Sequence, residues 1–182
     1  MKKILVTVLT LVLGLTLLGC GGSGGGGGST STDAASSLDK TFSMADGDIS
    51  FNVSSDWKES DGLIDSGVRE YLFQSGTGMF SVTFYSNTVI DPDQGLAAIK
   101  ELYADTYKVT NFKDISRNAF SRDGMSIVVF EYSYNDPNDG DTIERLAYIT
   151  KGNQQVIIFF LNYADRFDPS DFDALLKSFQ WK

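Results

Sequence analysis

Val156-Ile157-Ile158-Phe159-Phe160-Leu161 is an unbroken apolar run near the end of the chain. A strand that is apolar on both sides is typical of the centre of a sheet covered on both faces. The preceding Gly152-Asn153 has the length and residue types of a two-residue β-hairpin turn. The turn predicts that residues 142–151 pair with the run, with Ile149 beside Val156.

The two strands before this run form a second hairpin, whose register follows from its charges. Met125–Asn135 and Thr142–Lys151 flank a loop of turn-forming residues. Setting Glu131 opposite Arg145 also aligns apolar with apolar residues, and such cross-strand pairs stabilise a sheet by about 0.2–1 kcal/mol each. A shift of one residue would set Glu131 against Glu144 and move every side chain to the other face. We therefore expect an antiparallel meander that is apolar on both faces.

A sheet with two apolar faces needs a covering layer on each side, and two amphipathic helices can provide these layers. Asp91-Pro92 and Asp168-Pro169 each combine a helix N-cap residue with proline at the first helical position. The helical faces that follow are Leu96, Ile99, Leu102 or Tyr103, and Tyr107 in the first helix, and Phe172, Leu175, Leu176 and Phe179 in the second. The predicted class is α+β, an α/β/α sandwich with a central antiparallel sheet.

Three shorter strands are expected before the first helix. Ile49–Val53 and Phe80–Tyr85 alternate apolar with polar residues, and Glu70–Gln74 is a short strand between them.

The ends of this region carry a family resemblance. Ile49-Ser50-Phe51-Asn52-Val53 is followed by Trp57, and the chain closes with Leu175-Leu176-Lys177-Ser178-Phe179-Gln180-Trp181. With the helix and meander between them, these motifs resemble the PsbP/Mog1-like superfamily from about Thr41 to the end. The Pro-x-x-Trp common there reads Ser54-Ser55-Asp56-Trp57 here. The resemblance implies a non-catalytic binding or accessory module. Its better-known members act in photosystem assembly or bind a small GTPase, and many bacterial members are lipoproteins.

The N-terminus predicts where the protein works. Lys2-Lys3 precede an apolar run from Ile4 to Leu18, which is shorter than the roughly 20 residues that span a bilayer. The run ends in Leu17-Leu18-Gly19-Cys20, which resembles the lipobox of bacterial lipoproteins. The resemblance implies that residues 1–19 are a signal peptide and that Cys20 carries lipid, as a diacylglyceryl thioether with an acylated amino group. The alternative is an ordinary secretory signal that is cleaved elsewhere.

Residues 20–38 are predicted to be a lipidated cysteine followed by a flexible Gly/Ser-rich tether, with the globular domain at 39–182. Gly21–Gly28 is glycine with one serine, and residues 29–37 contain no large apolar side chain that could repay the entropy of ordering. Its G-x-S-x-G and G-x-G-x-x-G matches lack the strand-to-helix context that those motifs require. We expect the domain to be lipid-anchored outside the cytoplasm on the bacterial cell membrane. If the host has two membranes, the glycine at position 21 favours the outer one.

The charge of the chain limits its partners. The sequence has 24 acidic and 15 basic residues, a net charge of −9, and the predicted signal peptide contains two lysines and no acid. Such a surface repels nucleic acids and anionic lipid headgroups, and could attract cations or a basic partner. The expected partners are membrane lipid, through acylated Cys20, and an unknown protein or envelope ligand.

Catalysis is not expected. The chain has no histidine and one cysteine, which excludes histidine-dependent triads, ordinary zinc sites and disulfides. Ser37–Lys40 and Ser55–Lys58 match Ser-x-x-Lys, but neither opens a helix and the companion motifs are absent. Glu131 and Glu144, a candidate pair for glycoside cleavage, fall on opposite faces in the predicted register. No cofactor and no metal ligands are assigned.

The acidic residues of the loop at 136–141 suggest calcium binding, but their spacing does not match that of an EF-hand loop. If Gly140 were the glycine of an EF-hand loop, the third ligand would be Pro137 and the twelfth Leu146. Asp, Asn, Pro and Gly are also the usual turn residues, so a hairpin turn is favoured and weak cation binding is the alternative.

The candidate binding surface lies beside this loop. Tyr132, Tyr134 and Glu144 share one face near the end of the hairpin, next to Asp139 and Asp141. Tyrosine is enriched at interfaces because it combines contact area with a polar group. Exposure of these side chains would favour the hypothesis, and burial under a helix end would oppose it.

The predicted function is that of a membrane-anchored extracytoplasmic lipoprotein that acts as a non-catalytic binding or envelope-assembly accessory module. An assembly factor should present a flat, exposed apolar or tyrosine-rich patch. One alternative is a hydrolase that uses carboxylate, serine and tyrosine groups, which should show a deep cleft with convergent carboxylates. A weak cation-binding surface domain is the other.

Overall fold

A computed structural model describes residues 38–65, 67–74, 78–138, 140–163 and 169–182. The predicted signal peptide, Cys20, the tether up to residue 37, Asp139 and Asp168 lie outside these residues. The described elements are β1 (Lys40–Met44), η2 (Ala45–Gly47), β2 (Ile49–Val53), β3 (Lys58–Asp65), β4 (Val68–Gln74), β5 (Gly78–Tyr85), α2 (Pro92–Leu102), η3 (Tyr103–Tyr107), β6 (Thr110–Arg122), β7 (Met125–Asp136), β8 (Gly140–Lys151), β9 (Gln154–Tyr163), α3 (Pro169–Ser178) and β10 (Gln180–Trp181). None of the described helices is long and apolar enough to cross a bilayer.

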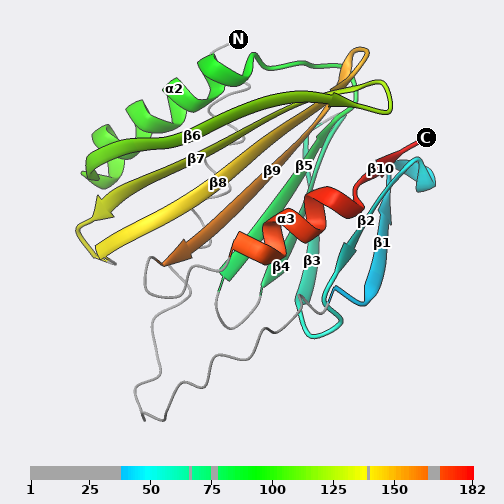
Figure 1. Cartoon of the computed structure of the whole chain (residues 1–182), viewed down its shortest axis with the longest axis horizontal. Helices are drawn as coiled ribbons and strands as arrows, with labels where there is room; N and C mark the ends of the chain where they lie inside the picture. Colours follow the sequence, from blue (N-terminus) through cyan, green and yellow to red (C-terminus); the bar gives the residue numbers. More distant parts are fainter. Residues whose placement is uncertain (1–37, 66, 75–77, 139, 164–168) are drawn as a thin grey trace.

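Seven strands form one antiparallel sheet in the order β3-β4-β5-β9-β8-β7-β6 (Figure 1). The predicted registers are confirmed, since Glu131 pairs with Arg145 and Ile149 pairs with Val156. Arg145 Nε also donates to Glu131 Oε2 at 2.5 Å. Because β9 lies between β5 and β8, the apolar run that begins at Val156 lies in the interior of the sheet, as predicted.

The sheet separates two apolar clusters that face opposite helices. Alternate residues of β9 enter different clusters, with Ile157 on the α2 side and Ile158 on the α3 side. The predicted face of the second helix is confirmed, because its four apolar residues are all buried in the α3-side cluster. Each central strand therefore contributes to both clusters.

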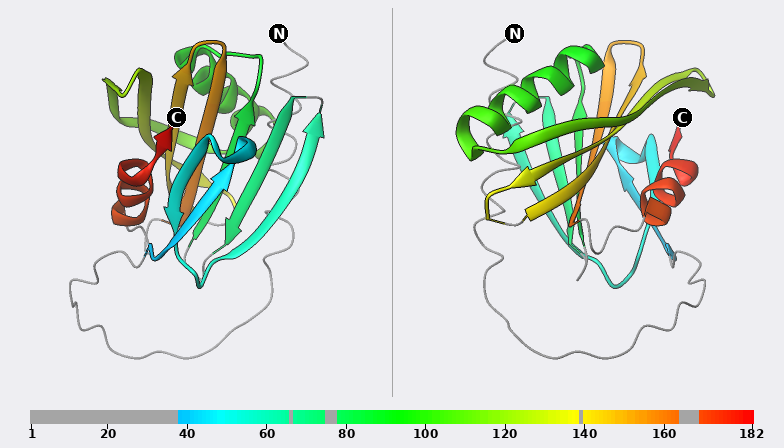
Figure 2. Two further views of the ribbon diagram at one scale, coloured as in Figure 1. Left: turned by 90° about the vertical axis from the view of Figure 1, so that its right-hand side faces the viewer. Right: turned by 60° about the vertical axis from the view of Figure 1, so that its left-hand side comes forward.

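The layer on the α3 side is not the single helix that the sequence predicted. Beside α3 lies a three-stranded sheet in the order β1-β2-β10, on the other side of the main sheet from α2 (Figure 2). Phe51 of β2 stacks on Phe179 with ring centroids 6.0 Å apart, and this contact joins the small sheet to the end of α3. The ten residues of α3 span about 15 Å, too short to cover strands of about 25–40 Å, so the small sheet covers the rest. The structure agrees with the predicted α+β class, but the layer on this side contains a small sheet as well as a helix.

Helix α2 begins as predicted and lies close to the sheet. The Asp91 side chain accepts a hydrogen bond from Gln94 N at 2.9 Å, and Pro92 is the first helical residue. Gly95 faces β8, where an added Cβ would lie 2.1 Å from Tyr148 Oη. Glycine is needed here because there is no room for a side chain.

After Leu102 the helix widens into a π-turn, η3. The wider turn ends at Lys108, whose left-handed conformation (φ 59°) redirects the chain into β6. Tyr103, the first residue of η3, is buried against the sheet. Such π-turns occur frequently at functional sites.

Strand β6 was not predicted from the sequence. It is the outermost strand beside β7, and each of its 13 residues is at least partly exposed. It therefore lacks the apolar–polar alternation by which half-buried strands are recognised. Its connection to β7, Asp123-Gly124, has positive φ at both residues, as a tight hairpin turn requires.

Candidate functional site

The predicted binding surface is not exposed. Tyr132 and Glu144 have exposed fractions of 0% and Tyr134 of 6%, so this expectation is wrong. They lie in the α2-side cluster, packed with Tyr103 of η3 and Phe112 of β6. The cover comes from the unforeseen β6 and from the helix end that the sequence analysis weighed as the alternative.

Of the two acidic loop residues predicted for that surface, Asp139 and Asp141, the structure describes one. Asp141 is exposed, and its Oδ1 accepts a hydrogen bond from Asn135 Nδ2 at 2.9 Å. Asp139 lies outside the described residues. Asp136 Oδ1 accepts from Asn138 N at 2.7 Å, a contact typical of a turn. Among the described residues, no group of three potential metal ligands is found.

The buried residues form a carboxylate–tyrosine cluster, which we define as Glu144, Tyr103, Tyr132 and Tyr134. Tyr103 Oη donates to Glu144 Oε1 at 3.2 Å, and the Tyr134 hydroxyl donates to the same oxygen. Glu144 Oε2 and Tyr132 Oη have no hydrogen-bond partner among the described residues. The cluster thus holds a carboxyl group whose Oε1 accepts two hydrogen bonds and which forms no ion pair with any described residue.

This environment changes the acidity of the whole cluster. Burial raises the pKa of Glu144 to about 7, although the three tyrosine hydroxyls lower it and Asp136 raises it further. Burial and the Glu144 charge raise the pKa values of Tyr103 and Tyr132 well above the usual tyrosine value. The tyrosines therefore stay neutral donors, and Glu144 is the group that can exchange a proton near neutral pH.

A second buried carboxylate lies on the same face of the sheet, in β4. Glu70 has an exposed fraction of 1%, and its Oε1 accepts from Ser81 Oγ at 2.6 Å. Its Oε2 and the nearby Tyr85 Oη have no hydrogen-bond partner among the described residues. Burial raises the pKa of Glu70, and the charge of Glu70 contributes to the raised pKa of Tyr85. The sequence pattern predicts a strand at Glu70–Gln74 but contains no sign that this carboxylate is buried.

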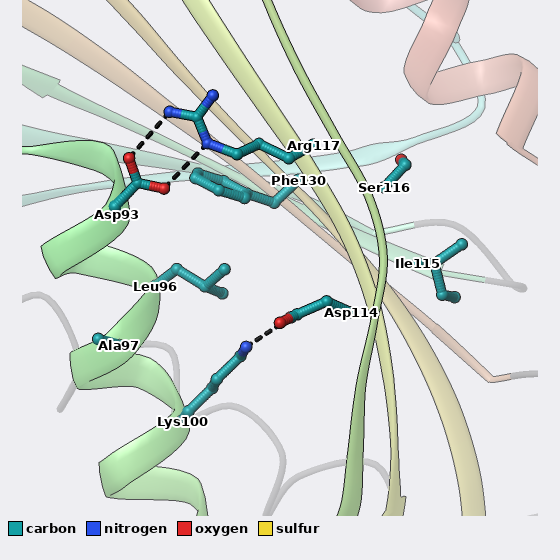
Figure 3. A pocket seen from close by; sticks show the side chains of 9 residues that line it. All are labelled: Asp93, Leu96, Ala97, Lys100, Asp114, Ile115, Ser116, Arg117 and Phe130. Atoms are coloured by element: carbon teal, nitrogen blue, oxygen red, sulfur yellow. Dashed lines mark hydrogen bonds and ion pairs between the residues drawn. The ribbon is translucent and has the colours of Figure 1, made fainter.

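An open groove lies on the surface next to the cluster, between α2 and β6 (Figure 3). Its volume is about 410 Å³. Leu96 projects from α2 into the space between two ion pairs, and Phe130 of β7 lies beside Arg117. The lining residues are Asp93, Leu96, Ala97, Lys100, Asp114, Ile115, Ser116, Arg117 and Phe130.

Two ion pairs join the walls of this groove. Arg117 Nε and Nη2 bind the two oxygens of Asp93 at 2.9 and 2.8 Å, a bidentate geometry that lowers the pKa of Asp93. Lys100 Nζ lies 2.5 Å from Asp114 Oδ1. The four charges cancel, so the groove is locally neutral on a chain of net charge −9. An apolar floor between paired charges suits an apolar group with polar edges.

Phe112 links the groove to the carboxylate–tyrosine cluster, because it lies close both to Lys100 of the groove wall and to Tyr134 of the cluster. The Phe112 ring lies 5.2 Å from the Tyr134 ring, and Lys100 Nζ lies 5.9 Å from the Phe112 centroid. Lys100 thus contacts both the groove wall and the cover of the buried carboxylate. The groove could not be predicted without β6, which forms one of its walls. The Asp123-Gly124 dipeptide is a known hairpin signal and could have predicted that strand.

The chain has a PsbP-like fold. It is similar to the solution structure of cyanobacterial PsbP (CyanoP) from Synechocystis sp. PCC 6803, with a TM-score of 0.62 and 20% sequence identity over 85% of this chain and 98% of that one. A crystal structure of a Bacteroides thetaiotaomicron VPI-5482 protein matches with a TM-score of 0.51 and 12% identity, over 80% of this chain and 49% of that one. No protein-family model and no curated protein matches the sequence.

Proposed function

We propose that this protein is an extracytoplasmic, lipid-anchored binding module, and that it binds its partner at the groove between α2 and β6. The anchor rests on the basic start, the short apolar run and the Leu-x-Gly-Cys pattern at Cys20. The binding role rests on one observation, an open groove with an apolar floor and paired charges along its walls. PsbP-like architecture is compatible with this role and does not specify it.

The groove chemistry defines what it would accept. Leu96 and Phe130 offer apolar contact, and Arg117 lies 5.6 Å over the Phe130 ring in a cation–π contact. The Asp93–Arg117 and Lys100–Asp114 pairs are partly exposed, so a ligand can reach their free hydrogen-bonding positions. A side chain or small group with an apolar body and a polar edge fits this description, and the neutral walls do not repel an anionic partner.

Binding is favoured over hydrolysis because the carboxylates are badly placed for catalysis. Glu144 has the perturbed pKa expected of an acid–base group, but its exposed fraction of 0% leaves it no contact with a substrate. The carboxylates of the groove, Asp93 and Asp114, are each neutralised by a basic side chain. A hydrolase that works through paired carboxylates would need at least one exposed carboxylate directed at a bound substrate.

The anchor is tested by mass spectrometry of the native N-terminus. The expected peptide begins at Cys20 and carries diacylglyceryl and acyl groups. The protein should partition into the membrane fraction, and Cys20→Ala should abolish the lipid mass. An unmodified peptide beginning at Met1 would overturn the proposed location.

The groove is tested by cross-linking in intact cells with paired variants of α2. Ala97 is exposed and lines the groove, whereas Gln94 is exposed on the same helix and does not line it. Ala97→Trp fills the groove and should remove the specific cross-linked species, while Gln94→Trp should retain them. Identical cross-linking patterns for the two variants would contradict a binding role for the groove.

A further inference from the structure

Strand β6 has one edge that no described strand pairs. The main sheet ends there, and all 13 residues of β6 are at least partly exposed. An open edge presents a row of unpaired N–H and C=O groups that another extended chain can bind. Proteins commonly protect such edges with bulges and other irregularities. The regularity of β6 therefore indicates which of its residues can pair with another strand.

The two halves of β6 differ in regularity. Its pairing with β7 is irregular between Thr110 and Lys113 and between Asp114 and Ser116, and Asn111 has a positive φ of 57°. Such irregularities bend a strand and discourage added pairing. From Ser116 to Arg122 the pairing with β7 continues without interruption. This regular segment of seven residues, about 23 Å long, is the usable template.

The regular segment also carries an exposed apolar anchor. Phe120 is 43% exposed, and Ile115 beside the segment is 45% exposed. Among the described residues, Val89 is the one other large hydrophobic side chain that is exposed to this degree. Phe120 pairs with Ile127, so an added strand would place an apolar side chain next to it on the same face.

The charge of the segment selects the occupant. Ser116–Arg122 contains two arginines and no acidic residue. Asp93 neutralises Arg117, so the positive charge of the segment comes from Arg122, which forms no ion pair among the described residues. Arg122 donates to the carbonyl oxygens of Leu176 and Phe179 at 2.8 and 2.9 Å, so no carboxylate neutralises it there. Pairing with a second copy of β6 would bring two positive edges together, whereas acidic residues on a partner would be attracted.

We propose that the regular segment of β6 binds an extended segment of a partner protein, rich in acidic and apolar residues, as an additional antiparallel or parallel strand. Its apolar side chains pack beside Phe120, and its other face lies beside Arg117 at the mouth of the groove. The main-chain hydrogen bonds provide affinity, and the side chains on the two faces provide specificity. The inference rests on the proposed binding function and names the chemistry of its partner.

The test uses the full chain in detergent micelles and three fluorescein-labelled ten-residue peptides. One peptide alternates valine with glutamate, one alternates valine with lysine, and the third is the glutamate peptide with alternate backbone nitrogens methylated. The glutamate peptide should bind at least about tenfold more tightly than either control, measured by fluorescence anisotropy. It should also slow hydrogen exchange of alternate amides within Ser116–Arg122, as strand pairing requires.

Two variants with similarly exposed sites locate the binding. Phe120→Asp should weaken binding of the glutamate peptide by about tenfold or more, and Val89→Asp should leave it unchanged. Equal binding of the three peptides, or equal effects of the two variants, would overturn the proposal. So would a dimer in sedimentation that the peptide does not displace, since a second copy would then occupy the edge.

Failure of the edge-binding proposal can be distinguished from failure of the proposed groove-binding function. If the peptide does not bind but Ala97→Trp still removes the in-cell cross-links, the edge is not used and the groove remains the binding site. If Phe120→Asp also removes those cross-links, one partner occupies both the groove and the edge.

Discussion

Glu144 combines complete burial with hydrogen bonds from two neutral tyrosines, and it forms no ion pair with any described residue. A buried carboxylic acid is less costly protonated than ionised, which is why its pKa rises to about 7 from 4.5. The folded chain therefore binds this proton more tightly than the unfolded chain does. The contribution of Glu144 to stability is fully present below about pH 4.5 and is lost as the pH rises through about 7.

The stability of the Glu144→Gln variant relative to the parent protein should depend on pH. Gln keeps a carbonyl acceptor for Tyr103 and Tyr134 and cannot ionise. The variant should gain stability relative to the parent between pH 4.5 and 7, by on the order of 3 kcal/mol in total, and the difference should then stay constant. Urea denaturation at four pH values measures this, with exposed Asp141→Asn as control. A difference that does not vary with pH would show that Glu144 does not titrate in this range.

Helix α2 is held against the sheet at a position where no side chain fits. An alanine at Gly95 would favour the helix by up to about 1 kcal/mol, but its Cβ would lie 2.1 Å from Tyr148 Oη and 2.8 Å from Cζ. Overpacking of this kind costs about 1–3 kcal/mol, so we expect the clash to dominate and Gly95→Ala to destabilise the protein. Chemical denaturation measures the loss. In a Tyr148→Phe background, which removes the nearest atom, the loss should be smaller, and an equal loss would exclude the hydroxyl contact as its cause.

Two arginines of β6 should contribute unequally to stability. Arg122 donates to carbonyl oxygens at the end of α3, where a cation complements the helix dipole, and its contacts are partly buried. Arg117 pairs with Asp93, and both side chains are largely exposed. Arg122→Gln should therefore cost about 1–3 kcal/mol, and Arg117→Gln less than about 1 kcal/mol. Thermal denaturation of both variants compares them directly. Equal losses would contradict the capping role of Arg122.

At the scale of the whole molecule, one sheet forms the wall of both apolar clusters. Ile157 and Ile158 are adjacent in β9 and buried on opposite faces. Removing either side chain to alanine should cost about 2–5 kcal/mol. Because every central strand serves both clusters, the two faces should unfold together.

The tryptophans provide the test of this coupling, because Trp57 and Trp181 both lie in the α3-side cluster. Ile157→Ala, on the α2 side, should lower the midpoint seen by tryptophan fluorescence as much as the midpoint seen by circular dichroism. Separate transitions by the two methods would mean that the α2 side unfolds independently.

The central hairpins could be predicted because their information is local. Glu131 and Arg145, the turn at Gly152-Asn153, and the apolar run from Val156 restrict the register to one solution, and the structure has that register. The helix at Pro92 was predictable for the same reason, from its cap and its spacing. The small sheet beside α3 was not, because its three strands come from the two ends of the domain.

The candidate site depended on contacts that local patterns do not contain. The face shared by Tyr132, Tyr134 and Glu144 followed from period-two spacing, and the structure places the three side chains together. Whether that face met solvent depended on Tyr103 and Phe112, which come from a helix end and from a strand that is exposed along its whole length. Strand register is local and was encoded in the sequence, whereas burial depends on which distant segment lies on top. The fold buried the predicted surface and opened a groove beside it.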